Sequence, residues 1–126
     1  MTSRDELVDQ VNRLVDQLRA MSLARLERTS VGLPSVAQSA HAFAQVLADL
    51  AADVRGVAHR DVPRLATLAS GDLVAVTAND LLSVTQHFDD SFSLDPVVAP
   101  EGIESAPAHV AIDVALAAVK SVRSQI

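Results

Sequence analysis

The residues best suited to chemistry gather near one short stretch, 85–96, which reads TQHFDDSFSLDP. It combines a histidine with three aspartates, and further histidines and aspartates precede and follow it in the chain. Clusters that are rich in oxygen ligands and free of cysteine suit Mg²⁺, Ca²⁺ or Mn²⁺. One hypothesis is therefore a divalent-metal site, a small-molecule site or an enzyme's active site, whose candidate residues are Asp80, His87, Asp89, Asp90, His109 and Asp113.

The spacing of these residues favours an ordinary helix end instead. Asp80 and His87 are seven residues apart, about 10.5 Å along a helix axis, so they cannot meet without help from neighbouring groups. The two aspartates that follow would stand at a helix C-terminus, where the dipole disfavours negative charge. His109 and Asp113, at i,i+4, equally form a surface pair. We therefore favour a half-exposed helix end that continues into an acidic loop, 89–105.

Most established catalytic patterns are absent from the sequence. It contains no Cys, Tyr or Trp, which removes thiolate nucleophiles, disulfides and most stacking platforms for bases. There is no phosphate-binding glycine loop, nucleophile elbow, zinc-protease motif or EF-hand loop. His41 is expected on the polar side of its helix, and His59 lies among glycine and proline residues without a further pattern. The sequence predicts no cofactor and points away from an enzyme.

Three zones that contain all the glycine and proline residues divide the chain into four segments. Within each segment apolar residues recur at intervals of three and four, which is typical of amphipathic helices. Capping boxes are predicted at Ser3–Glu6 and Ser35–Gln38, and Asp72 is the predicted N-cap of the third helix. The sequence predicts an all-α, up-and-down four-helix bundle in one domain, 1–126, with helices at about 3–28, 35–55, 72–88 and 106–125 and a short helix at 63–69.

Charge is unevenly distributed along the chain. Residues 1–64 contain eight arginines and eight acidic residues, whereas 65–119 contain eight acidic residues and no lysine or arginine. Nucleic acids and anionic membranes require basic surfaces, so neither is an expected partner. The acidic half either keeps an alanine-rich bundle soluble or meets a basic protein partner. The longest uncharged stretch, 29–48, is too polar to span a membrane, and we expect a soluble, cytoplasmic protein.

Two segments carry more apolar residues than a peripheral position requires. Segment 106–125 is apolar over most of its circumference, so it is either a central helix or part of a subunit interface. The acidic loop also contains apolar residues that would fold back on the bundle or dock on a partner. The sequence thus favours protein–protein association, with a homo-oligomer or a basic protein as the partner. The candidate contact residues are Phe92, Leu94, Val110 and Val114.

Overall fold

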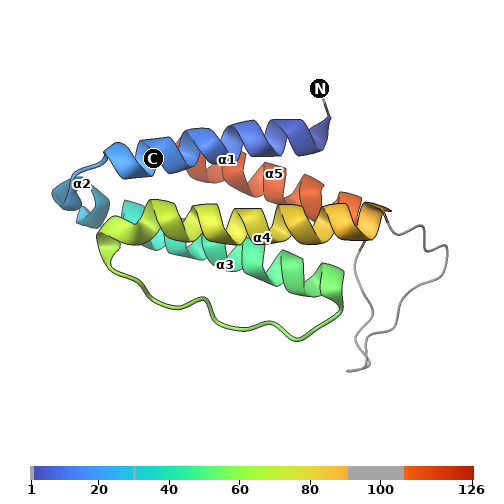
Figure 1. Ribbon diagram of the computed structural model, residues 1–126. Helices are drawn as coiled ribbons and strands as arrows, with labels where there is room; N and C mark the ends of the chain where they lie inside the picture. Colours follow the sequence, from blue (N-terminus) through green and yellow to red (C-terminus); the bar gives the residue numbers. More distant parts are fainter. Residues whose placement is uncertain (1, 30, 91–106) are drawn as a thin grey trace.

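Four long helices lie alongside one another in the computed structural model, which describes residues 2–29, 31–90 and 107–126, without the side chains of 88–90 (Figure 1). The described part of the chain contains no strand, so the predicted all-helical bundle is confirmed. The elements are α1 (Ser3–Ala20), α2 (Leu23–Glu27), α3 (Val36–Arg55), the 3₁₀ turn η1 (Thr67–Ala69), α4 (Ser70–Asp90) and α5 (Ala108–Gln125).

The bundle differs from a strict up-and-down order in its connections. Residues 57–66, which we call the strap, have no regular secondary structure and return along α3, so that α3 and α4 run in the same direction (Figure 1). Helices α1 and α5 are also parallel, since Glu6 pairs with Lys120 and Gln10 with Arg123. Ten extended residues reach about 33 Å, slightly more than the roughly 30 Å of a 20-residue helix. The strap is therefore long enough to cross the bundle.

The first predicted helix, 3–28, is interrupted near its end. The chain leaves the helical conformation at Met21, and Ser22 caps a new N-terminus by accepting a hydrogen bond from the Arg25 amide at 3.2 Å. A serine that bonds the backbone three residues on competes with continuation of the preceding helix. The short helix α2 that results packs against α3 and η1 at one end of the bundle.

The predicted caps are confirmed at one helix and displaced at another. The box at Ser35–Gln38 forms as predicted, with both reciprocal hydrogen bonds. At the start of α1 the box is one residue earlier than the predicted Ser3–Glu6. Thr2 accepts from the Asp5 amide at 3.1 Å, and the Asp5 carboxylate accepts from the Thr2 amide at 3.2 Å.

Three of the later helix boundaries differ by two residues from the prediction: α4 starts before 72 and ends at Asp90, beyond the predicted 88, and α5 starts after 106. Helix α4 starts at Ser70, because η1 leads directly into it, and the short helix predicted at 63–69 is reduced to this three-residue turn. Asp72, predicted as the N-cap, instead accepts a hydrogen bond from Arg19 at 2.7 Å. Helix α5 begins at Ala108, after Pro107, rather than at 106. Helix α3 ends at Arg55, as predicted, and its C-cap is Gly56, whose φ of 72° is a left-handed conformation that glycine adopts without steric cost.

The core is aliphatic, apart from Phe43, and continuous along the four long helices. Each of them contributes side chains that are almost fully buried, among them Leu14, Leu47, Leu81 and Val119. Helices α3 and α4 share the largest interface, while α5 packs against both α1 and α3. Burial of such side chains contributes about 1.5–3 kcal/mol each relative to exposure, so this core is the main source of stability.

Arg4 joins the start of α1 to the last turns of α4. Its Nη1 donates to Thr85 Oγ1 at 2.9 Å, and its Nη2 donates to the Leu82 carbonyl oxygen and to Gln86 Oε1. Thr85 is completely buried. Because hydrogen bonds to charged groups contribute about 1.5–3 kcal/mol, we expect Arg4→Met to lower the free energy of unfolding by about that amount in urea denaturation.

The matched control for Arg4 is Arg13, which forms an exposed i,i+4 pair with Asp9 at 3.0 Å on the same helix. Exposed pairs of this kind contribute roughly 0.3–0.5 kcal/mol. Arg13→Met should therefore change the free energy of unfolding much less than Arg4→Met. Equal losses in the two variants would contradict the role given to Arg4.

Candidate functional site

The predicted metal ligands do not form one cluster among the described side chains. Asp80 is engaged by Arg55, whose Nη2 donates at 2.7 Å, whereas His87, His109 and Asp113 are exposed on α4 and α5. No three His, Cys, Asp or Glu side chains in the described ranges are arranged to hold a metal ion. The remaining candidates lie outside the described side chains: Asp89, Asp90, Phe92 and Leu94.

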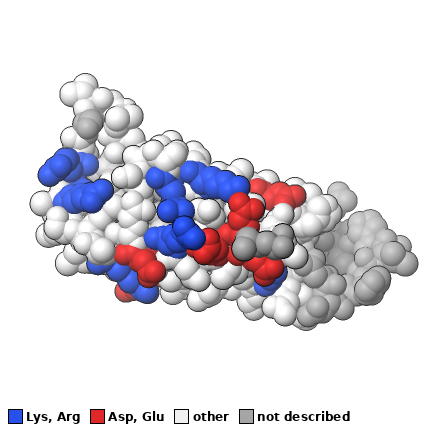
Figure 2. Space-filling view, turned by 90° about the horizontal axis from the view of Figure 1, so that it is seen from above, with Lys and Arg blue, Asp and Glu red and all other residues white. Residues whose placement is uncertain are grey.

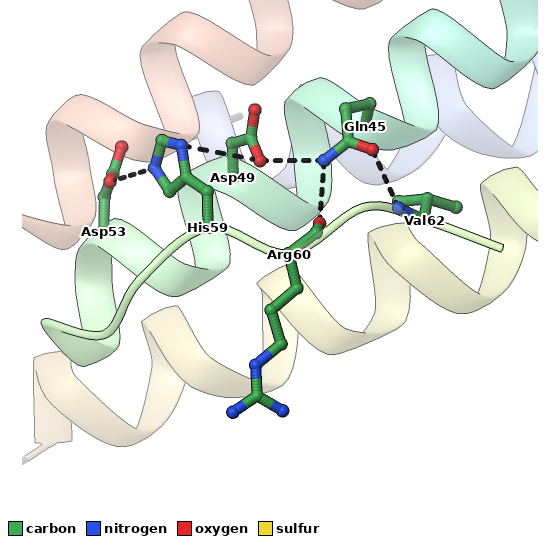
Figure 3. Close-up of polar contacts among 6 residues, drawn as sticks. All are labelled: Gln45, Asp49, Asp53, His59, Arg60 and Val62. Carbon is green, nitrogen blue, oxygen red and sulfur yellow. Dashed lines mark hydrogen bonds and ion pairs between the residues drawn. The ribbon is translucent and has the colours of Figure 1, made fainter.

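A row of polar side chains on α3 holds the strap (Figure 3). Its members are four residues apart and share one face of the helix: His41, Gln45, Asp49 and Asp53. Gln45 makes two contacts with the strap backbone, donating to the Arg60 carbonyl oxygen at 3.0 Å and accepting from the Val62 amide at 2.8 Å. His41, expected at the surface, is half-buried and donates to the Val62 carbonyl oxygen at 3.3 Å. The four-residue spacing of these polar side chains can be seen in the sequence, but the sequence does not indicate that they bind the strap.

His59 fastens the start of the strap to the same face of α3 (Figure 3). Its Nε2 lies 2.6 Å from Asp53 Oδ1, and its Nδ1 lies 3.6 Å from Asp49 Oδ1. The hydrogen bond to Asp53 raises the pKa of His59, and the charges of both carboxylates act in the same direction. A raised folded-state pKa means that this contact stabilises the fold fully below the ordinary histidine pKa of about 6.5 and is lost as pH rises through the folded-state value.

Asp53→Asn should move the pKa of His59 back toward its ordinary value, because it removes the main cause of the shift. The measurement is an NMR titration of the His59 ring protons. Asp16→Asn, an exposed aspartate on α1, is the control and should leave the His59 pKa unchanged. A His59 pKa that stays raised in Asp53→Asn would contradict this assignment.

A groove without charged side chains runs between α3 and α5. It has a volume of about 310 Å³, with Phe43 among its lining residues. Most of its lining consists of small or apolar side chains on both helices, namely Ser39, Ala42 and Val46 of α3 and Ala118, Ser121 and Val122 of α5, together with the amide side chains of Gln38 and Gln125. We call this surface the α3/α5 groove. Its composition suits an apolar partner surface and offers no charge to position a polar substrate.

Val110 and Val114 extend the apolar row of the groove along α5. They precede Ala118 and Val122 at intervals of four, so all four side chains share one face of the helix. Each of the two valines is 44% exposed, although the opposite face of α5 is buried in the core. Helix α5 is therefore a peripheral helix with a second, exposed apolar row, and not the central helix that its composition also allowed.

The groove opens at the α2 end of the bundle into a larger pocket of about 580 Å³. The two cavities share Pro34, Ser39 and Gln125, so they form one continuous surface. Arg25 and Arg28 line this second cavity, which we call the arginine pocket. Its apolar lining comes from Leu33, Pro34, Val36 and Ile126. Within the described part of the chain, neither arginine side chain forms an ion pair or hydrogen bond.

The fold brings acidic residues from the second half of the chain next to arginines from the first half. Two of the acidic residues in the arginine-free region, Asp72 and Asp80, are paired with Arg19 and Arg55. These pairs leave the arginine pocket as a basic site at one end of the bundle. Figure 2 shows basic side chains at the α2 end, on the left, and basic and acidic side chains side by side nearer the middle of the same face.

Comparisons of the chain with protein-family models, curated proteins and solved structures give no match. In the ranges that the structure describes, no helix has the length and apolar character needed to cross a membrane. The fold and the surface together define a small helical bundle whose distinguishing feature is an uncharged groove that ends in a basic pocket.

Proposed function

We propose that this protein works by protein–protein association through the α3/α5 groove, and that its partner is a second copy of the chain. The observation that carries this proposal is the uncharged apolar surface that the groove forms with Val110 and Val114, each 44% exposed. Contiguous apolar surface of this kind typically marks an interaction site in a soluble protein.

A second copy fits this surface because a twofold dimer brings the same patch of both subunits together. Charged patches resist such pairing, since like charges then face each other, whereas the α3/α5 groove contains none. Four of its lining residues, Ser39, Ala42, Ala118 and Ser121, have small side chains, which lets two helices approach closely. A basic protein partner finds less support in the described surface, because Asp72 and Asp80 already pair with arginines of the same chain.

Sedimentation equilibrium over a wide range of protein concentrations tests the proposal. With a dissociation constant in the micromolar range, about 8 kcal/mol of association free energy, the mass should rise from that of one chain to that of two across the range. The chain mass is 13.3 kDa, so the dimer mass is twice this value. A mass of one chain at every concentration would contradict self-association.

A further inference from the structure

We infer that the arginine pocket binds the acidic segment, residues 89–105, of a second copy, so that the two copies associate in opposite directions. The inference rests on the proposed self-association, to which it adds an orientation and a second set of binding residues.

The lining of the arginine pocket suits an acidic ligand that also has apolar side chains. Arg25 and Arg28 have no carboxylate partner within the described part of the chain, and both line the same cavity. A guanidinium group binds a carboxylate through two parallel hydrogen bonds, which makes arginine well suited to this recognition. Leu33, which is 65% exposed, belongs to the apolar lining beside them. The cavity volume of about 580 Å³ falls in the usual range for binding sites.

The chain itself contains a segment with this chemistry. Residues 89–105 carry five acidic side chains and no lysine or arginine. The segment also contains five apolar side chains that lie between its acidic ones: Phe92, Leu94, Val97, Val98 and Ile103. It therefore offers both the carboxylates and the apolar groups that the pocket would bind.

The charges at the two ends of the bundle favour an antiparallel orientation of the two copies. If the copies lay parallel, the two arginine pockets would face each other, which like charges oppose. In the opposite orientation, with the twofold axis near Ala117 at the middle of α5, position 108 of one copy lies over position 125 of the other. Gln125 lines the arginine pocket, and the acidic segment of the partner ends just before its Ala108. The antiparallel arrangement thus brings opposite charges together at both ends.

Binding of the segment within its own chain is disfavoured by distance. The segment begins with the last two residues of α4, and residues 91–107 connect α4 to α5, whereas the pocket lies at the C-terminal end of α5, about 27 Å away along this 18-residue helix. A connection of 17 residues that is fixed at both ends can reach a point about 28 Å away only if the residues on both sides of that point are fully extended. Extension of this kind costs conformational entropy that the partner's segment does not have to lose.

The test uses a fluorescent peptide of residues 89–105 and the Val114→Asp variant, in which the groove is blocked for self-association. The substituted position is 11 residues from Gln125, about 16 Å along the helix, so its charge is largely screened at the pocket in physiological salt. We expect the peptide to bind in fluorescence anisotropy and to bind more weakly as salt increases. Arg25→Glu with Arg28→Glu should weaken binding by about 100-fold, roughly tenfold for each charge-assisted pair.

Two controls separate charge at the pocket from overall charge. Arg60→Glu with Arg64→Glu changes the net charge by the same amount on exposed arginines of the strap, and it should leave peptide binding nearly unchanged. A peptide with Asn and Gln in place of Asp and Glu leaves the protein intact, and it should lose binding. Binding that survives the Arg25 and Arg28 reversal, or the amide peptide, would overturn the inference.

The outcome also distinguishes this inference from the proposed function. A chain that dimerises but does not bind the peptide would overturn the pocket assignment and leave self-association in place. A chain that stays monomeric but binds the peptide, with loss of binding in the Arg25 and Arg28 variant, would overturn self-association and support the pocket's preference for this segment.

Discussion

Replacing Val114 by aspartate should convert the proposed dimer into monomers, raising its dissociation constant by at least about 1000-fold. In a twofold interface one substitution occurs twice, and both new carboxylates would be buried without a partner. One buried, unpaired charge costs about 3–5 kcal/mol, so the two carboxylates together cost more than the roughly 4 kcal/mol that corresponds to a factor of 1000. Sedimentation equilibrium of the variant at the highest concentration that gives a wild-type dimer measures the effect.

Val76 provides the matched control for this prediction. It is an exposed valine on α4, 67% accessible to solvent, and it lies outside the α3/α5 groove. Val76→Asp adds the same charge to the chain, so it should leave the dissociation constant within a few-fold of the wild type. Dissociation in both variants would indicate a general effect of charge, and dissociation in neither would place the interface elsewhere.

The helices of this protein could be predicted from local features of the sequence. Four-residue and three-residue spacing of apolar side chains requires only that each helix bury one face. The capping box at Ser35–Gln38 is equally local, because its two hydrogen bonds join residues three positions apart. For the same reason the break at Ser22 could have been detected, since Ser22 caps the helix that follows.

The connections could not be predicted in the same way. A breaker zone that contains Gly56 and Pro63 indicates a long link, but it does not state whether the link reverses the chain or crosses back along the bundle. That choice depends on tertiary contacts, namely those of Gln45 and His59 with the strap and with α3. The periodic pattern of α4 is the same whether the helix lies parallel or antiparallel to α3.

The candidate site was visible in the sequence only in part. Val110 and Val114 were predicted as contact residues because the last helix is apolar over most of its circumference, and the structure places both at the surface. Arg25 and Arg28 gave no such indication, since they belong to a region in which positive and negative charges are equal in number. Their significance depends on which arginines find partners in the fold, and Arg19 and Arg55 are the ones that pair with the acidic residues of α4.

Phe43→Ala should lower the free energy of unfolding by about 3–5 kcal/mol, a large part of the 5–15 kcal/mol typical of a domain. Phe43 is the largest fully buried side chain among the described residues, 2% exposed, and it lies between the core and the α3/α5 groove. Its removal leaves a cavity that small neighbouring side chains cannot fill. Phe43→Leu, which keeps most of the volume, should cost less than about 1.5 kcal/mol. Urea denaturation in the Val114→Asp background excludes dissociation from both values, and a loss below 1.5 kcal/mol for Phe43→Ala would show that this side chain is not enclosed as described.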